Sequence, residues 1–505
     1  MNWKGVINVL SVVILICSLA IGLSGIVSIL SDDNHRISII LITYSILLII
    51  FSSIMFYLSK GKKHELRTRE GFLIVSLCWF SIIIVGAMPF YIVEKMRFID
   101  CLFETASGFS TTGASIIDSN LILRNGEKLG GLSTISKGIL FWRSMTHWLG
   151  GMGIIVLSIA ILPYLGIGGK KLYEAEVSSA SSSQLAPRIT DTAKMLWGVY
   201  ILMSITQTIL LMIGGMSLFD AWCHTCGTIA TGGFSTSPYS ISAFDSFYIE
   251  VIIIVFMFLG CSNFVLHHNA LKKGLKVYWN DEEFRSNLIV SLLCGIGLTF
   301  IIYGKNWVDA ANRHIDSSNI FSAGRYAFFQ VVSIKSTTGF CTADFDSWPD
   351  IAKLILLMLM LIGGCAGSTT GGIKHVRIIL LAKYSVMQIK RTLFPHSLSN
   401  VTLNGVRVEA TTLHKVLTFF FIYFAITAIS ALILCTQPGN DLITSVSAAI
   451  SCIGSIGPAF AKLGPLCTYS WMSDLSKSIL IFLMVLGRLE IFTLAVIFLP
   501  SFWKN

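Results

Sequence analysis

The sequence predicts an all-α integral membrane protein of ten transmembrane helices, most of them arranged in four repeats. Of its 505 residues, 54% are hydrophobic and 13% are charged, whereas charged residues form about a quarter of an ordinary soluble chain. The apolar runs repeatedly reach the roughly 20 residues needed to cross about 30 Å of hydrocarbon. Four shorter segments that end in glycine recur between these runs. These observations exclude a soluble multidomain protein.

The net charge of +10 comes from 37 basic and 27 acidic residues. The basic residues cluster in short loops between apolar spans, which is the positive-inside signature of membrane topology. We therefore expect a lipid bilayer around the chain and no nucleic-acid partner. The first apolar segment, 7–30, is too long for the core of a signal peptide and has no A-x-A-like cleavage site, so it is interpreted as a retained span.

The order of the spans sets the expected topology. Spans over 7–30 and 38–59 precede the loop 60–70, whose five basic and two acidic residues place it in the cytoplasm. Later spans are expected at 71–93, 138–165, 194–216, 247–271, 286–304, 351–383, 412–436 and 475–500. With ten spans, both termini are cytoplasmic, and the basic loops 272–285 and 374–391 fall on the same side.

Four semi-polar segments between the spans are too short to cross a bilayer. They lie at 99–113, 219–233, 321–339 and 440–457. We expect re-entrant helices that enter from the outer side. Irregular backbone at membrane depth is tolerated only where it contacts protein or lines a water-filled path, so four such segments indicate a pore.

These segments define a fourfold repeat of span, short helix, glycine turn and span. Their ends read Ser110-Thr111-Thr112-Gly113, Ala230-Thr231-Gly232-Gly233, Ser336-Thr337-Thr338-Gly339 and Gly454-Ser455-Ile456-Gly457. Six residues before each final glycine the side chain is small: Ser107, Gly227, Ser333 and Ser451. Thirteen residues before it, Asp100, Asp220 and Thr444 carry oxygens that can cap a helix. We divide the chain into two N-terminal helices, 1–70, and four repeats: 71–170, 190–275, 285–392 and 410–505.

A second sequence pattern, which we call the glycine mark, recurs in the span that follows each turn. An apolar residue, a glycine and a variable residue recur as Leu149-Gly150-Gly151, Leu259-Gly260-Cys261, Ile362-Gly363-Gly364 and Leu486-Gly487-Arg488. Any single glycine turn is equally compatible with a flexible connection between helices. Four turns in register, each followed by the same mark, favour a shared function.

The chemistry of the turns suits a monovalent cation. Rings of backbone carbonyls replace the hydration shell of such an ion without a fixed charge that would trap it, and glycine lets the backbone approach the axis at positive φ. The short helices would direct their negative C-terminal ends at the cation. The turns carry neither an acidic ring nor a cluster of soft ligands, which disfavours Ca²⁺ and transition metals.

The repeat closely resembles the Trk/Ktr/HKT superfamily of potassium transporters, and the two extra leading spans resemble its bacterial TrkH-like branch. The resemblance implies one K⁺ filter within a single subunit, formed by Thr111, Thr112, Gly113, Thr231, Gly232, Gly233, Thr337, Thr338, Gly339, Ser455, Ile456 and Gly457. Glycine rather than serine at Gly113 implies K⁺ selectivity over Na⁺. The fourth turn lacks the Thr-Thr pair of the first and third.

A glycine-rich stretch interrupts the span expected at 351–383. Five glycines lie within 363–374, and each disfavours a helix by about 1 kcal/mol relative to alanine, so the helix should break. The resemblance implies an intramembrane gate formed by Gly363, Gly364, Gly367, Ser368, Thr369, Thr370, Gly371 and Gly372, together with Arg488 as a positive barrier in the pore. The alternatives are a kinked helix without a moving part and a purely structural pairing of Arg488 with a carboxylate.

The function implied by the resemblance is potassium uptake across the bacterial inner membrane. The alternative is a Na⁺-permeable or Na⁺/H⁺-coupled transporter of the same architecture. A membrane-embedded hydrolase is disfavoured because no Ser/His, paired Asp or H-E-x-x-H arrangement is found, and we expect no enzyme activity and no cofactor, with K⁺ as the substrate.

The sequence contains no nucleotide-binding P-loop or GxGxxG motif, so we expect this chain to bind no nucleotide itself. The family uses a separate ring of cytosolic RCK-type nucleotide-binding subunits, TrkA-like, on a transporter homodimer. The basic stretch 374–391 is a candidate docking face for that ring, and contact with anionic lipid is the alternative.

Overall fold

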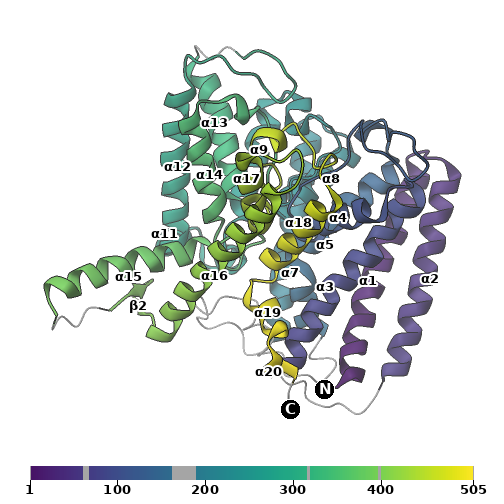
Figure 1. Ribbon diagram of the computed structural model, residues 1–505, viewed down its shortest axis with the longest axis horizontal. Coiled ribbons are helices and arrows are strands. Elements are labelled where there is room, and N and C mark those ends of the chain that lie inside the picture. Colours follow the sequence, from purple (N-terminus) through teal and green to yellow (C-terminus); the bar gives the residue numbers. More distant parts are fainter. Residues whose placement is uncertain (1, 61–67, 162–188, 316–318, 396–399, 504–505) are drawn as a thin grey trace.

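The structure is a computed structural model that describes residues 2–60, 68–161, 189–315, 319–395 and 400–503. Within these residues the chain is mostly helical (Figure 1). The only paired strands in this part are β1 (Thr402–Leu403) and β2 (Val406–Arg407), which form a small antiparallel hairpin. The predicted all-α class is confirmed.

The first two helices form a hairpin at the edge of the molecule. They are α1 (Trp3–Leu30) and α2 (His35–Ser59), and Figure 1 shows both beside α3 (Thr68–Val93). Small residues let the pair approach closely: the Ser45 hydroxyl donates to the Ser18 carbonyl at 2.7 Å. Outside this contact α2 is mostly exposed, as expected of a helix whose other faces meet lipid rather than protein.

Four short helices lie between longer ones, as the repeat predicts. They are α4 (Phe98–Phe109), α8 (Leu218–Ile229), α13 (Ile320–Lys335) and α17 (Leu442–Gly454). In the first repeat α4 lies between α3 and α5 (Lys137–Ile161), and in the second α8 lies between α7 (Ile189–Ile213) and α9 (Phe247–Gly260). In the third α13 lies between α12 (Glu282–Ile302) and α14 (Asp350–Ile362), and in the fourth α17 lies between α16 (Ala410–Cys435) and α18 (Asp474–Arg488). Each short helix also contacts the second long helix of the preceding repeat: α4 packs on α18, α8 on α5, α13 on α9 and α17 on α14. The four repeats therefore close a ring.

The predicted helix caps are wrong by about one turn. Ser217 and Asp441 accept the capping hydrogen bonds of α8 and α17, from the N–H groups of Asp220 and Thr444. Asp100 is fully buried, and its carboxylate instead accepts from Lys477 Nζ at 2.7 Å. Because a cap and a residue of the first turn share the same polar composition, spacing alone did not distinguish them.

The second long helix of every repeat is interrupted just beyond its glycine mark. Gly153 breaks α5 with φ 53° and ψ 167°. The helix α9 meets α10 (Phe264–Lys273) at 101°, and α18 meets the segment Phe492–Phe498 at 108°. The glycine-rich loop, defined as residues 363–374, separates α14 from α15 (His375–Leu393).

These breaks correct the predicted spans. By length and composition, six described helices can cross a membrane singly, and two bent pairs can do so together. The segments 247–271 and 475–500 are bent rather than continuous, the break expected within 351–383 is present, and the end of the span expected at 138–165 lies outside the described residues. Hydropathy did not reveal the two bends, because it reports how apolar a segment is and not the direction in which its helix continues.

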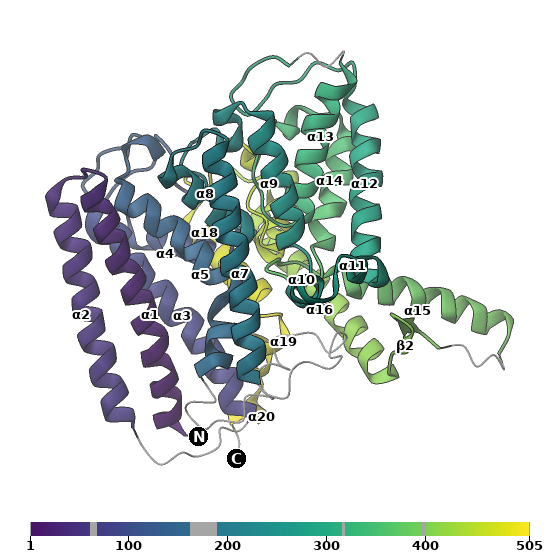
Figure 2. The ribbon, with the colours of Figure 1, turned by 180° about the vertical axis from the view of Figure 1, so that it is seen from behind.

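Short elements complete the chain. They are α11 (Lys276–Asn280), α19 (Phe492–Ala495), α20 (Pro500–Trp503), and the 3₁₀ helices η1 (Leu132–Thr134), η2 (Ser240–Phe244), η3 (Phe345–Ser347), η4 (Ala461–Leu463) and η5 (Val496–Phe498). The start of α1 and α20 lie at the same end of the molecule, and α15 extends away from its body (Figure 2).

Candidate ion pathway

The four glycine turns, residues 110–113, 230–233, 336–339 and 454–457, adopt one backbone conformation. The second residue of each turn is left-handed: φ is 54° at Thr111, 56° at Thr231, 56° at Thr337 and 56° at Ser455. The final glycines have φ of 81° at Gly113, 80° at Gly233, 78° at Gly339 and 104° at Gly457. Left-handed residues therefore recur at the second and fourth positions of every turn. A non-glycine residue held at positive φ costs about 1–3 kcal/mol and marks functional sites.

The four turns meet in a closed cycle. A Cβ atom added to the final glycine of each turn would collide with a carbonyl oxygen of another turn. The distance is 2.1 Å from Gly113 to the Gly232 oxygen, 1.9 Å from Gly233 to that of Thr338, 2.0 Å from Gly339 to that of Ile456, and 2.7 Å from Gly457 to that of Thr112. Each turn therefore contacts the next, and the fourth contacts the first. Only glycine permits these approaches.

Each turn is held to its own short helix by one repeated hydrogen bond. The donors are the N–H groups of Thr112, Gly232, Thr338 and Ile456, and the acceptors are the carbonyls of Ser107, Gly227, Ser333 and Ser451, at 2.9, 2.7, 2.9 and 3.0 Å. The small residues predicted six places before each glycine are thus the acceptors. At Gly227 a Cβ atom would lie 2.9 Å from the Phe340 ring, which explains why a small residue is needed there.

Polar side chains on the short helices hold the chain just beyond each turn. Glu104 accepts from the Ile116 N–H at 3.0 Å, and His224 Nε2 lies 2.9 Å from the Ser235 hydroxyl. Gln330 contacts Thr342 at 3.3 Å, and Ser447 accepts from the Phe460 N–H at 3.1 Å. Glu104, His224 and Gln330 therefore support the turns from behind.

A buried ion pair strengthens this support in the first repeat. Arg143 Nε donates to Glu104 Oε1 at 2.6 Å, and its second nitrogen donates to the Ser235 carbonyl at 3.0 Å. Arg143 is 4% exposed and Glu104 is 1% exposed. Because Ser235 belongs to the second repeat, this arginine joins two quadrants of the cycle.

We expect Arg143→Ala to lower the free energy of unfolding by about 3–5 kcal/mol, because it leaves the buried Glu104 carboxylate without its cation. Thermal unfolding of the purified protein in detergent would measure the loss. Lys353→Ala is the matched control: its pair with Asp350 is exposed, at 3.6 Å, and such pairs contribute about 0–1 kcal/mol. Equal losses in both variants would contradict the assigned support.

The glycine marks of the long helices have a packing role. A Cβ atom on Gly150 would lie 2.0 Å from the Phe109 carbonyl oxygen, and one on Gly487 would lie 2.0 Å from that of Ile453. Both carbonyls lie at the end of a short helix, four residues before the final glycine of the turn. These marks therefore let α5 and α18 cross the ends of α4 and α17.

The glycine-rich loop lies against the same ends of the turns. The Thr231 hydroxyl is 3.3 Å from that of Thr369, and the Gly371 N–H donates to the Thr337 hydroxyl at 3.2 Å. A Cβ atom on Gly371 would lie 2.4 Å from the Gly454 carbonyl. The loop thus contacts three of the four quadrants, and its small residues make this approach sterically possible.

Arg488 connects the loop to the remaining quadrant. Its two terminal nitrogens donate to the Thr369 carbonyl at 2.6 Å and to the Gly151 carbonyl at 2.8 Å, with the Gly150 carbonyl at 2.5 Å. These acceptors are backbone carbonyls of the loop and of the first repeat, so the guanidinium of Arg488 lies beside the loop. Arg377, which follows the loop on α15, contacts Glu490 at 2.5 Å.

Sequence reasoning missed Glu283 as part of this site. Its Oε1 accepts from the N–H groups of Ala366, at 2.8 Å, and Val376, at 2.9 Å. One carboxylate oxygen thereby holds the loop and the start of α15. A carboxylate at the start of an apolar span was the available signal, but only the fold brings it to the loop.

Fewer basic side chains of the stretch 374–391 are exposed than the proposed docking face assumed. Lys374 and Arg377 are buried, and Lys374 Nζ donates to the Thr370 carbonyl within the loop. Lys383 Nζ contacts Glu282 at 2.6 Å. Among the five Lys and Arg residues of this stretch, only Lys390 and Arg391 are classed as exposed, because Lys374 and Arg377 are buried and Lys383 is half-buried in its ion pair.

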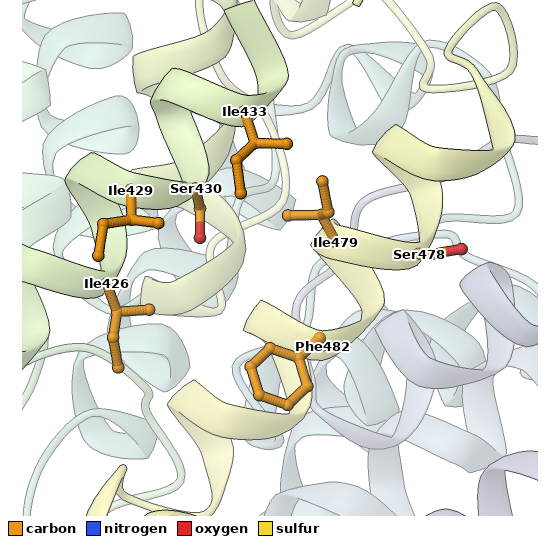
Figure 3. Close-up of a pocket in the computed structure, with 7 residues that line it drawn as sticks. All are labelled: Ile426, Ile429, Ser430, Ile433, Ser478, Ile479 and Phe482. Atoms are coloured by element: carbon orange, nitrogen blue, oxygen red, sulfur yellow. The ribbon is translucent and has the colours of Figure 1, made fainter. Parts of the chain in front are cut away.

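An apolar groove of about 420 Å³ lies apart from the turns, between α16 and α18 (Figure 3). Its lining consists of Ile426, Ile429, Ser430, Ile433, Ser478, Ile479 and Phe482. These side chains offer few oxygens for a cation, so the groove is not part of the ion pathway.

Comparison with known proteins agrees with this geometry. A family model described as TrkH, cation transport protein, matches residues 38–505. The chain is 36% identical to the Trk system potassium uptake protein TrkH of Salmonella typhimurium over 100% of both chains, and 34% identical to the Trk system potassium uptake protein TrkG of Escherichia coli over 89% of this chain and 88% of that one. The crystal structure of the potassium transporter TrkH from Vibrio parahaemolyticus superposes with a TM-score of 0.84 at 33% identity over 100% of both chains. The resemblance inferred from the sequence is confirmed, and a membrane-embedded hydrolase is excluded: this chain belongs to the TrkH family of cation transport proteins.

Proposed function

We propose that this protein takes up potassium through a filter formed by the four glycine turns. The observation that carries the proposal is the closed cycle, in which each glycine lies within van der Waals contact of the next turn's carbonyl. One chain thereby surrounds one axis with backbone oxygens. Such rings replace the waters of a monovalent cation, and the relatives named as potassium uptake proteins make K⁺ the expected ion.

The carbonyls of the two residues before each final glycine are the proposed ion ligands. They belong to Thr111, Thr112, Thr231, Gly232, Thr337, Thr338, Ser455 and Ile456. All eight are buried, and the seven other than Gly232 have 0% relative exposure. The turns are fixed by their short helices. A rigid ring of this kind favours an ion that fits it over a smaller one that leaves its oxygens too far apart.

The glycine-rich loop and Arg488 are the proposed gate. The loop is hydrogen-bonded to Thr231 and Thr337, two hydroxyls at the end of the turns. An ion leaving the filter on this side meets the loop and the guanidinium of Arg488. We therefore assign the described conformation to the closed state, which opens when the loop leaves these hydroxyls.

The membrane placement and partners complete the proposal. The positive-inside pattern places both termini in the cytoplasm, and the bacterial relatives favour the inner membrane. The family resemblance supports a homodimer with a cytosolic TrkA-like nucleotide-binding subunit and the division of the chain into four repeats after residue 70. Lys390 and Arg391 are the remaining basic part of the proposed docking face.

Flux into liposomes holding the purified protein tests this function. Under an imposed voltage we expect K⁺ and Rb⁺ to enter faster than Na⁺ and Li⁺. Protein-free liposomes give the leak, and opening the gate by Arg488→Ala provides a conducting form. Equal entry of Na⁺ would overturn the K⁺ selectivity in favour of a Na⁺-permeable transporter, and dependence of K⁺ entry on a Na⁺ or proton gradient would favour coupled transport.

A further inference from the structure

The fourth glycine turn lacks the hydroxyl pair that supports the first and third turns. In the first and third turns, paired hydroxyls lie 2.7 Å apart, Ser110 with Thr112 and Ser336 with Thr338. The fourth turn has Gly454 and Ile456 at these positions, so no hydroxyl pair can form there.

The second turn is supported from outside its own repeat. The space beside Gly232 is filled by the His147 ring, whose Cγ would lie 2.5 Å from an added Cβ. His147 Nε2 accepts from the Phe234 N–H at 3.2 Å, so its Nδ1 donates to the Gly108 carbonyl at 2.8 Å. The fourth turn needs a comparable external support, and its geometry is the most divergent: Gly457 has φ 104°, and its contact with the next turn is the longest of the four.

Tyr469 contacts the fourth turn directly. Its hydroxyl donates to the Gly457 carbonyl at 2.8 Å. The side chain is 1% exposed, and its ring lies 5.5 Å from that of Phe103 on α4. Tyr469 therefore lies at the junction of the fourth and first repeats, where the cycle closes.

The first repeat fixes the position of this tyrosine. The Tyr469 N–H donates to the Ser115 carbonyl at 2.9 Å. Its neighbours Thr468 and Ser470 both donate their hydroxyls to Asp118 Oδ2 at 2.5 Å. Three hydrogen bonds thus attach the segment 468–470 to the chain beyond the first turn, so the tyrosine hydroxyl transmits the position of the first quadrant to the fourth.

We infer that Tyr469 is a positioning residue for ion selectivity, which holds the Gly457 peptide so that the fourth turn keeps its distance from the axis. The inference rests on the proposed potassium function. Without the hydroxyl, the least supported turn is free to move inward around a smaller ion. Tyr469 takes no part in binding the ion itself.

The test is the K⁺ to Na⁺ permeability ratio of Tyr469→Phe in liposomes, measured in the Arg488→Ala background so that the pathway conducts. We expect the ratio to fall about threefold to tenfold, the range that corresponds to one lost hydrogen bond, while K⁺ flux persists. Tyr423→Phe is the matched control: Tyr423 is also 1% exposed, and within the described residues its hydroxyl has no hydrogen-bond partner.

The outcomes separate this inference from the proposed function. If the parent protein, which carries Arg488→Ala and keeps Tyr469, shows no preference for K⁺, the proposed function itself is overturned. A selective parent whose ratio is unchanged by Tyr469→Phe, or lowered equally by Tyr423→Phe, would overturn the role of Tyr469 alone. If Tyr469→Phe does not fold, Asp118→Ala, which releases the segment 468–470, decides the question: an unchanged ratio there contradicts the inference.

Discussion

Gly113→Ser is expected to lower the K⁺ to Na⁺ permeability ratio by about tenfold or more, equivalent to about 1.4 kcal/mol of lost discrimination. Gly113 has φ 81°, and a Cβ atom there would lie 2.1 Å from the Gly232 carbonyl oxygen. The new side chain must displace either its own turn or the second one. Since the neighbouring carbonyl is a proposed ion ligand, the displacement changes the ring rather than a distant surface. Ion flux in liposomes measures the ratio.

Gly126→Ser separates backbone strain from displacement of the ring. Gly126 has nearly the same backbone angle, φ 82°, but nothing lies within 4 Å of an added Cβ. We expect this variant to be slightly destabilised and to keep the selectivity of the unmodified protein. If Gly113→Ser leaves the permeability ratio unchanged, the first turn does not belong to the filter.

Arg488→Ala is expected to raise cation flux by about ten- to a hundredfold. The substitution removes a positive charge beside the path. It also removes the hydrogen bonds that the guanidinium donates to the Thr369 carbonyl of the loop and to the Gly150 and Gly151 carbonyls of α5. A unit charge about 4 Å from a passing cation opposes it by up to about 4 kcal/mol at an effective dielectric constant of 20. Initial rates of Rb⁺ entry into liposomes measure the effect.

Two further variants distinguish the charge from the hydrogen bonds. Arg488→Lys keeps the charge but not the forked donor geometry, so we expect its flux to lie nearer to that of the unmodified protein if electrostatic repulsion dominates. Arg124→Ala removes an exposed arginine outside the pathway that donates to the Tyr91 carbonyl, and its flux should not change. A flux in Arg488→Ala no greater than in Arg124→Ala would remove Arg488 from the gate.

The fourfold repeat shows which structural features can be predicted from local sequence. The four glycine turns, the small residues behind them and the helix break at 363–374 were all predicted, because each depends on backbone chemistry that neighbouring residues carry with them. The predicted caps at Asp100, Asp220 and Thr444 were wrong by about one turn. The continuous helices expected over 247–271 and 475–500 were also wrong, since hydrophobicity specifies membrane burial but not direction.

The membrane class, the fourfold repeat and the positions of the glycine turns follow from the amino-acid sequence, because apolar length, glycine conformation and spacing are local properties. Which groups contact one another was set by the tertiary fold. The fold placed Arg488 on backbone carbonyls of the loop and of the first repeat, brought Glu283 to the loop and to the start of α15, and brought the Tyr469 hydroxyl to Gly457. These contacts join residues far apart along the chain, so they depend on how the repeats close into a ring and on nothing that a single segment encodes.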